Sequence, residues 1–427
     1  MLKSLRKVQK QNRLLRDEEG LLMRILVVCQ HYWPEPYRLP DICEELVKRG
    51  HQVKVITDIP NYPMGAIYEG YEGGKQRDQE RNGVAIHRCF TIPRKTGTLY
   101  RFLNYYSYAI SSTLWAKRTK ETFDVVFTNQ TSPVMMSCAA IAYGRKHNKK
   151  VVMYTQDLWP ACLQAGGIRK GSLIDRIFHW VSGRVYRGVD KIMISSKGFR
   201  QYLVEEHRVP TERIEYLPQH AEDIFAKGAA AKQHEGINLV FAGNIGVAQS
   251  VETIILAAEA LKDNDQIKWH IVGDGIDLER CKALVAAKGL NSVVFHGRKP
   301  LQEMPEYYAM ADAMLLTLMD DPDISRTLPG KVQTYMAAGK PILCAANGEV
   351  QDVIREAQCG YAVGAGDWKG LAGCVRRFIK DREQIPFGNN ARQYYDAHFT
   401  KEIVLGKLEQ ELLSHSMRRD LHNGQHV

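Results

Sequence analysis

The strongest constraint on the fold is an alternation of short apolar runs with an amphipathic helical segment near the start of the chain. Residues 23–29 (MRILVVC) and residues 53–57 (VKVIT) are apolar runs of strand length. Between them lies a helical pattern that ends at Gly50, with apolar residues at Leu39, Ile42, Cys43, Leu46 and Val47. The order strand, helix, strand predicts a parallel sheet whose ligands bind at the carboxyl ends of the strands.

The same alternation begins again in the second half of the chain. Residues 226–235 are small and polar without apolar periodicity, and beyond them lie a strand pattern at 238–242 and a glycine-bearing loop at 243–250. This predicts an α/β fold with two tandem Rossmann-like domains that face a central cleft. The predicted parts are a basic extension (1–22), an N-terminal domain (23–218), a linker (219–236), a C-terminal domain (237–385) and a C-terminal helix with a tail (386–427), in which residues 394–413 have a helical pattern.

Composition narrows the class of protein. Hydrophobic residues make up 44% of the 427 positions and charged residues 25%, as in a soluble globular enzyme. The nine cysteines form no CxxC pair, which argues against a zinc site and a disulfide framework, and favours a reducing compartment. We find no apolar run of the roughly 18 residues that a membrane span needs, and no signal peptide. We therefore expect a cytoplasmic protein.

Positive charge is concentrated in one segment. Six basic side chains and no acidic one lie between Arg94 and Lys120, within a formal net charge of +10. Such a face suits nucleic acid or an anionic membrane, although a solvated basic surface is an equal alternative. A helical pattern at 99–115 carries an apolar stripe of Leu99, Phe102, Leu103, Tyr106, Ile110 and Leu114. The stripe indicates either core packing or contact with a membrane interface.

The segment Ser325–Pro341 (SRTLPGKVQTYMAAGKP) is the predicted phosphate site. It follows an apolar run at 313–318 and passes through Pro329-Gly330 into a segment of good helix formers. Backbone N–H groups at a helix start bind anions, and Lys331 adds a positive charge there. We expect a nucleotide-sugar diphosphate at this position. In the first domain, Arg38 is either a second phosphate ligand or an ordinary surface arginine.

Polar side chains follow two further strand patterns of the first domain. Thr128 to Pro133 come after one apolar run, and Thr155 to Pro160 come after the next. Asp157 is the only carboxylate on these two loops, so we expect it to touch an acceptor hydroxyl. A helix-capping or turn aspartate is the alternative.

Eight motifs, in order, resemble the two-Rossmann retaining glycosyltransferases of family four, in the bacterial branch of fucosamine-type and surface-polysaccharide transferases. They cover the chain from Met23 to about Phe399. The motifs are HYWPEPYRLPDICEELVKRGH (31–51), IPNYPMG (59–65), LNYYSYAISS (103–112), QTSPV (130–134), QDLWP (156–160), SSKGF (195–199), FAGNIGVAQS (241–250) and LPGKVQTYMAAGKPI (328–342).

The resemblance implies the GT-B architecture and metal-independent, retaining transfer by a hexosyltransferase-type enzyme. The donor, expected to be a UDP-linked deoxyamino sugar, would be held mainly by the C-terminal domain, and no cofactor is expected. A polyprenyl-diphosphate-linked saccharide for O-antigen or capsule assembly would bind the N-terminal domain, at the inner face of the cytoplasmic membrane. Predicted donor-binding residues are Gly243, Asn244, Gly246, Gln249, Arg298, Arg326, Leu328, Pro329, Gly330, Lys331, Thr334 and Arg38. Predicted acceptor-binding residues are Asn129, Gln130, Gln156 and Asp157, and predicted catalytic residues are Asp157, Lys331 and Glu35.

The sequence departs from the family pattern at several positions, so the prediction of the phosphate site depends more on Lys331 and Arg326. The two glutamates that flank the phosphate loop in the wider family would fall at Arg326 and Thr334, and neither position is acidic here. The cations usual in the glycine loop are replaced by residues such as Asn244 and Gln249. No general base is evident, which fits a mechanism in which the leaving diphosphate takes the acceptor proton.

Three alternatives stay open at this point. Asp320-Asp321-Pro322-Asp323 resembles the metal-binding motif of another glycosyltransferase fold, and we interpret it as a solvated acidic loop. A nucleotide-sugar 2-epimerase would use the same scaffold but needs acid–base carboxylates. A nucleic-acid-binding module would draw on the positive charge but lacks a recognition motif. The prediction is a transferase first and an epimerase second.

Overall fold

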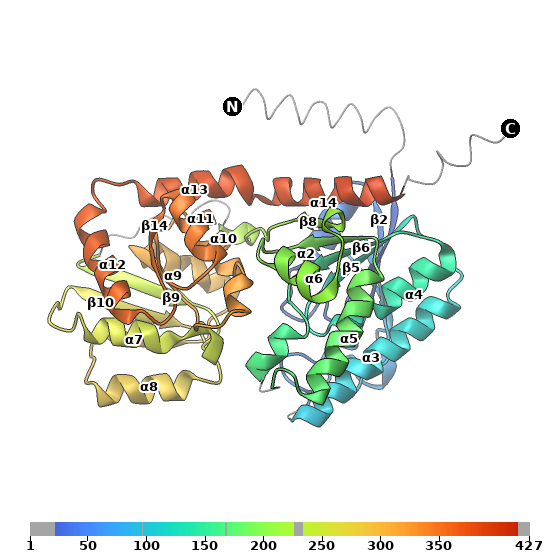
Figure 1. Cartoon of the computed structure of the whole chain (residues 1–427), viewed down its shortest axis with the longest axis horizontal. Coiled ribbons are helices and arrows are strands. Elements are labelled where there is room, and N and C mark those ends of the chain that lie inside the picture. Colours follow the sequence, from blue (N-terminus) through green and yellow to red (C-terminus); the bar gives the residue numbers. More distant parts are fainter. Residues whose placement is uncertain (1–21, 96, 167–168, 226–233, 417–427) are drawn as a thin grey trace, which may run out of the picture. The chain divides into compact units, whose positions relative to one another are not determined.

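The computed structural model describes residues 22–95, 97–166, 169–225 and 234–416 (Figure 1). The predicted basic extension, part of the linker and the end of the tail lie outside these residues. The described chain divides into two compact units. The first comprises the residues up to Asp157, His179–Met193 and the residues from Leu405, and the second comprises Leu158–Phe178 and Ile194–Val404. The domain boundaries drawn from the sequence stay a prediction.

The first sheet has eight strands in the order β3-β4-β2-β1-β5-β6-β7-β8. Strands β4, β2, β1, β5 and β6 pair in parallel, and β3 is antiparallel to β4. The strands are β1 (Arg24–Val28), β2 (Gln52–Thr57), β3 (Asp78–Arg81), β4 (Val84–Arg88), β5 (Val125–Gln130), β6 (Val151–Thr155), β7 (Lys191–Ile194) and β8 (Ile214–Tyr216). Every residue of β5 and β6 is buried, as expected for parallel strands covered on both faces.

The second sheet has six strands, all parallel, in the order β11-β10-β9-β12-β13-β14. They are β9 (Ile237–Ala242), β10 (Ile267–Val272), β11 (Val293–Gly297), β12 (Ala313–Thr317), β13 (Ile342–Ala345) and β14 (Gly360–Val363). Two buried hydrophobic clusters cover this sheet, one including Ile254 and Val375 and the other including Tyr335 and Val353. Two α/β assemblies with parallel sheets confirm the predicted fold class.

The helices follow the predicted alternation with the strands. In the first sheet's part of the chain they are α2 (Leu39–Lys48), α3 (Thr98–Arg118), α4 (Cys138–His147), α5 (Leu173–Arg187) and α6 (Phe199–His207). The remaining helices are α7 (Val251–Glu259), α8 (Leu278–Ala287), α9 (Met304–Met310), α10 (Gly330–Ala337), α11 (Glu349–Ala357), α12 (Trp368–Asp381), α13 (Phe387–His398) and α14 (Lys401–Ser416). None of the helices in the described part of the chain is long and apolar enough to cross a membrane.

Two predicted boundaries are wrong. Strand β5 runs on to Gln130, because its pairing with β6 continues to Thr155, so Asn129 and Gln130 end a strand and do not begin a loop. The helical pattern at 394–413 is two helices, α13 and α14 (Figure 1). The break lies at Phe399, which is buried, and at Thr400, whose Oγ1 accepts the backbone N–H of Ile403 at 3.3 Å.

Most of the apolar stripe of helix α3 is exposed. Leu99 and Ile110 of the stripe are 67% and 59% exposed, and Leu103, Tyr106 and Leu114 are exposed as well. The buried residues belong to another face of the helix: Asn104, Tyr105, Tyr108, Ala109, Ser112 and Ala116. The interpretation of the stripe as core packing is therefore wrong for most of its residues, because a second stripe at helical spacing occupies the core.

Within the first unit, helix α14 is tied to the end of α2 by buried charges. The Glu409 carboxylate lies 2.8 Å from Nη1 of Arg49 and 3.0 Å from Nε2 of His51. The side chains of Arg49 and His51 are only 6% and 3% exposed. Removal of the carboxylate from such a cluster leaves the buried charge of Arg49 with less compensation.

We expect Glu409→Ala to lower the free energy of unfolding by about 3 kcal/mol, because Arg49 would lose its nearer buried counter-ion and keep only Glu45, at 3.7 Å. The matched control is Gln410→Ala, which changes the next residue of the same helix, an exposed one. Urea unfolding measures both variants. Equal stability of Glu409→Ala and the control would show that the cluster contributes nothing.

Candidate functional site

The start of helix α10 is fixed against the end of strand β9. The Tyr335 hydroxyl donates to the carbonyl oxygen of Ala242 at 3.1 Å, and the N–H of Ala242 lies 3.3 Å from the same hydroxyl. These contacts bring two predicted donor-binding segments together, the glycine loop after β9 and the segment Leu328–Lys331.

Lys331 packs directly beneath Gly243. A Cβ at Gly243, where φ is +140°, would lie 2.4 Å from Cε and 2.7 Å from Nζ of Lys331, so only glycine leaves room for the ammonium group. Nζ lies 4.0 Å from the centre of the Phe241 ring. Burial lowers the pKa of Lys331 to about 7, and no carboxylate among the described residues pairs with it. An ammonium group held in this way can stabilise an anion that brings its own negative charge.

The other predicted residues of the glycine loop hold one another. The amide of Asn244 donates to Oε1 of Gln249 at 3.0 Å. A Cβ at Gly246 would lie 2.7 Å from the Asn244 amide nitrogen, so Gly246 makes room for this pair. The loop therefore carries two neutral amide side chains at the positions where the family usually has cations.

The segment before α10 contacts the SSKGF motif within the second unit. Leu328 donates its backbone N–H to Oγ of Ser196 at 2.8 Å, and a Cβ at Gly198 would lie 2.7 Å from the carbonyl oxygen of Arg326. Pro329 then precedes the first helical residue, Gly330, as the cap of α10. Ser196 is a residue that the sequence analysis placed in a motif without a role, and it positions the helix start.

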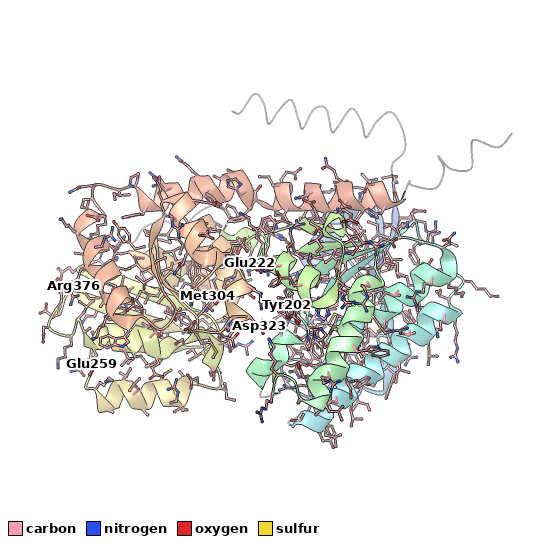
Figure 2. The ribbon with its side chains drawn as sticks, in the orientation of Figure 1. Tyr202, Glu222, Glu259, Met304, Asp323 and Arg376 are labelled. Carbon is pink, nitrogen blue, oxygen red and sulfur yellow. The ribbon has the colours of Figure 1, made fainter. Side chains whose placement is uncertain are left out.

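Arg326 differs from Lys331 because its charge is already paired. Its guanidinium forms an ion pair with Asp323 and lies 5.4 Å from the centre of the Tyr202 ring. Tyr202 and Asp323 lie close together in Figure 2. Compared with Arg326, Lys331 is therefore the cation without a carboxylate partner among the described residues.

Thr334 and Arg298 occupy different surroundings. The Thr334 hydroxyl contacts the carbonyl oxygen of Gly330 at 3.0 Å and Oε2 of Glu222 at 3.2 Å. Glu222 thus brings a carboxylate next to the position where the resemblance led us to expect one, from 112 residues away in the chain. Arg298 is exposed at the end of β11 and forms no ion pair with a described residue.

The acidic loop 320–323 is engaged in local hydrogen bonds. Oδ1 of Asp321 accepts the backbone N–H groups of Asp323 and Ile324 at 2.9 and 3.0 Å. Asp320 accepts the side-chain amide of Asn347 at 2.9 Å. Asp323 is paired to Arg326, so the carboxylates of this acidic loop, which we interpreted as solvated, are engaged in local contacts of the protein.

The four predicted acceptor residues meet at the carboxyl ends of β5 and β6. The Gln156 amide donates to Oδ1 of Asn129 at 2.9 Å, and the Gln130 amide donates to the carbonyl oxygen of Asp157 at 3.1 Å. Burial raises the pKa of Asp157, while hydrogen bonds from Ser132 oppose the rise. The cluster offers amide and carboxyl groups suited to hydroxyl ligands.

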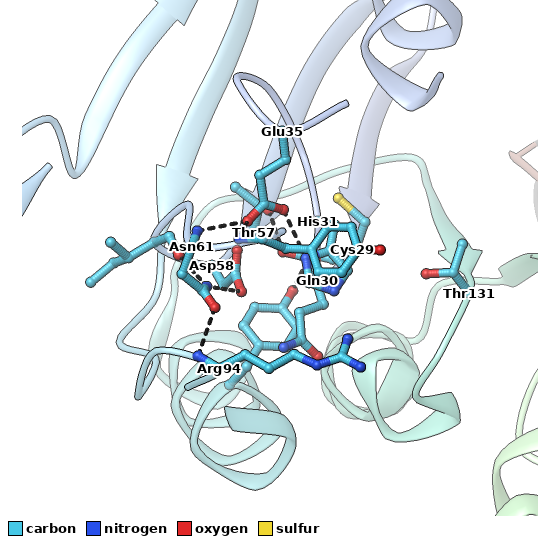
Figure 3. A network of polar contacts seen from close by, with 12 residues as sticks. Cys29, Gln30, His31, Glu35, Thr57, Asp58, Asn61, Arg94 and Thr131 are labelled. Atoms are coloured by element: carbon cyan, nitrogen blue, oxygen red, sulfur yellow. Dashed lines mark hydrogen bonds and ion pairs between the residues drawn. The ribbon is translucent and has the colours of Figure 1, made fainter. Parts of the chain in front are cut away.

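Glu35 is buried within a polar network of the first unit (Figure 3). Its Oε1 accepts the backbone N–H groups of Asn61 and Tyr62 at 2.7 and 2.6 Å, and its Oε2 lies 2.7 Å from Nδ1 of His31. The contact between Glu35 and Nδ1 orients the imidazole of His31. The structure thus gives Glu35 a positioning geometry, and the His31–Glu35 pair, spaced i and i+4, is a feature that the sequence analysis missed.

Asp58 completes this network. Its pKa is raised by burial and by the nearby charge of Glu35. Among the described residues, His31, Glu35 and Asp58 have ligand atoms within 4.8 Å of one another, which is close enough for a metal ion. Three hydrogen bonds already engage Glu35, so we interpret the group as the hydrogen-bonded core of the loop. Arg38, the remaining predicted residue, is partly buried at the start of α2 and lies near the buried Tyr154.

Comparisons with known proteins identify the family. Residues 37–220 match the family model of the glycosyl transferase 4-like domain, and residues 223–394 match the model of glycosyl transferases group 1. The chain is 25% identical over 416 residues to the putative colanic acid biosynthesis glycosyl transferase WcaI of Escherichia coli (strain K12), covering 90% of this chain and 98% of WcaI.

Solved structures share the fold. Sucrose-phosphate synthase from Thermosynechococcus elongatus superposes with a TM-score of 0.72 at 15% identity, covering 91% of this chain and 98% of that one. Anabaena HepE, solved in complex with UDP, superposes with a TM-score of 0.67 at 13% identity, covering 92% of this chain and 100% of that one.

The two family models together account for most of the chain, one for each half, and they meet near the predicted linker. The matched models and WcaI all carry transferase names, and none of them supports the epimerase alternative. This chain therefore belongs to the glycosyltransferases that combine a glycosyl transferase 4-like domain with a group 1 domain.

Proposed function

We propose that the protein transfers a sugar from a nucleotide-sugar donor, with retention of configuration and without a metal, onto a lipid-linked saccharide in cell-surface polysaccharide assembly. The observation that carries the proposal is Lys331, a cation without a carboxylate partner among the described residues, packed under Gly243 at the start of α10. A diphosphate that leaves the sugar gains negative charge, and an ammonium group beside a helix start stabilises that charge.

The names of related proteins support a nucleotide-sugar donor and a role in polysaccharide biosynthesis, without specifying the sugar or the acceptor. WcaI is named for colanic acid biosynthesis, and HepE was solved with UDP. We infer a UDP-linked donor, a deoxyamino sugar in particular, and a polyprenyl-diphosphate-linked acceptor. Asn129, Gln130, Gln156 and Asp157 would contact the acceptor hydroxyl, whose proton passes to the leaving diphosphate.

A thermal-shift panel of nucleoside diphosphates tests the donor site. We expect UDP to raise the melting temperature, and Lys331→Met to weaken UDP binding about 10- to 100-fold, because one charge-assisted contact is lost. The control Lys262→Met removes an exposed lysine from the same unit. If no nucleoside diphosphate stabilises the wild-type protein, the proposal fails.

The lowered pKa of Lys331 gives this binding a pH dependence. UDP binds the ammonium form, so affinity in the wild type should fall as the pH rises from 7 to 9, while the phosphate with its pKa near 6 stays ionised. Calorimetric titration should show proton uptake on binding at pH 8.5. In Lys331→Met the affinity should be constant over this range, and a parallel decline in both proteins would assign the effect to another group.

Reaction stereochemistry tests the mechanism separately. We expect transfer to continue in excess EDTA, and the new glycosidic bond to keep the anomeric configuration of the donor. Proton NMR of the purified product measures the configuration. An inverted product would contradict retention, and activity restored only by a divalent cation would contradict metal independence.

Helix α3 supports peripheral contact with a membrane. Its exposed apolar residues neighbour Arg101, Lys117 and Arg118, which are exposed too. Helix α5 also exposes Trp180, at 61%. Basic side chains beside exposed aromatic and aliphatic groups favour an anionic lipid surface.

Flotation with liposomes tests this contact. We expect the protein to float with anionic liposomes at low salt and to be released at about 0.5 M salt, because screening weakens surface charges. Replacing Leu103 and Ile110 with serine should reduce flotation without changing UDP binding. Equal flotation of the variant would exclude α3 as the contact surface.

A further inference from the structure

Arg94 is a cation of the first unit that forms no ion pair with any residue the structure describes. It follows β4 and is partly buried. Its guanidinium lies 5.5 Å from the centre of the Tyr62 ring and 5.6 Å from that of Tyr105. Stacking on two rings restricts the side chain, so the charge is held in place without a carboxylate to neutralise it.

The backbone around Arg94 is held just as firmly. Its N–H donates to Oδ1 of Asn61 at 3.0 Å, and the side-chain amide of Asn104 donates to the same oxygen at 3.2 Å (Figure 3). Asn104 also donates to the carbonyl oxygen of Ile92 at 2.8 Å. A Cβ at Gly65 would lie 2.9 Å from the carbonyl oxygen of Arg94. The backbone at Gly65 therefore packs closely against the backbone at Arg94. The guanidinium is thus preorganised by folding.

Arg94 and the predicted acceptor residue Asp157 both lie near Tyr37. In Figure 3 the side chain of Arg94 passes beneath His31 toward the side on which Thr131, the residue after β5, lies. The rings of Tyr37 and His31 stack with their centres 4.9 Å apart. The charge of Arg94 lowers the pKa of Tyr37, and the charge of Asp157 raises it. The Asp157 carboxyl group, which can bind a hydroxyl, and the Arg94 guanidinium, which can bind an anion, therefore both lie near Tyr37.

Several buried polar atoms nearby also lack hydrogen-bond partners among the described residues. They include Nε2 of His31, Oε1 of Gln130, Oε1 of Gln30 and Oδ1 of Asp58. Buried polar atoms are normally hydrogen-bonded, and their exceptions concentrate where a ligand or water is absent. They give a second, independent indication that this end of the sheet receives a polar ligand.

We propose that Arg94 binds a phosphate group of the acceptor, as an oxyanion site separate from the donor site at Lys331. This inference rests on the proposed transferase function, and it names the anionic part of the acceptor. A planar guanidinium matches two phosphate oxygens at once, and the adjacent faces of Tyr62 and Tyr105 suit the apolar or sugar groups attached to that phosphate.

Geranyl diphosphate, a short soluble prenyl diphosphate, is the probe for this site. The full chain is first saturated with UDP so that the donor site is occupied, and binding is then measured by calorimetry. We expect Arg94→Gln to weaken geranyl diphosphate binding at least tenfold while UDP affinity stays unchanged. The matched control Arg145→Gln removes an exposed arginine from α4, in the same unit, and it should bind the probe like the wild type.

Arg94→Lys is a second variant, which keeps the positive charge and so tests the proposal even if Arg94→Gln misfolds. Lysine keeps the charge but not the two-pronged geometry, so we expect an intermediate affinity. The proposal is overturned if the wild type does not bind the probe, if Arg94→Gln binds it as well as the wild type does, or if Arg145→Gln loses as much affinity as Arg94→Gln. Failure of the transferase proposal has a different signature, namely no UDP binding and no donor turnover by the wild type.

Discussion

The approach of Lys331 to Gly243 is the contact on which the second unit's site depends. It requires a glycine at the end of β9, a helix start held by Tyr335 and an aromatic ring beneath the ammonium group. The glycine and the ring lie at the end of β9, and Tyr335 and Lys331 belong to α10. Together the two elements place a desolvated cation at the start of a helix. A donor diphosphate would supply the counter-charge that the protein itself leaves out.

The first unit uses the opposite arrangement. Its carboxylate Glu35 is fully engaged by backbone N–H groups and His31, and the neighbouring Arg94 is left without a counter-ion among the described residues. Buried polar groups of this kind keep a loop in one conformation, because every alternative would leave them unsatisfied. The loops after β2 and β4 can thus hold an accessible cation in a fixed place.

Much of the fold was predictable from periodicity. The helix at 39–48 and the strands around it follow from apolar spacing and glycine punctuation, and so does the strand–loop–helix around Pro329. Errors arose where pairing or packing extends beyond local pattern. Strand β5 continues through polar Asn129 and Gln130 because its neighbour continues, and α3 buries its less apolar face because that face meets the core.

The candidate site, like the fold, was predictable only in the features that depend on local sequence. Residue types and motif order were sufficient to identify the glycosyltransferase family. The roles of Lys331, Asn129, Gln130, Gln156 and Asp157 in donor and acceptor binding stay predictions. The sequence does not reveal that Asp323 neutralises Arg326, that Glu222 approaches Thr334, or that Glu35 faces His31. Those pairings depend on which side chains the folded chain brings within hydrogen-bonding distance. Local sequence alone therefore determined the strands, helices and chemical groups, whereas the tertiary structure decided which charges are paired and which remain available, because electrostatic interactions depend on distance and burial and not on position along the chain.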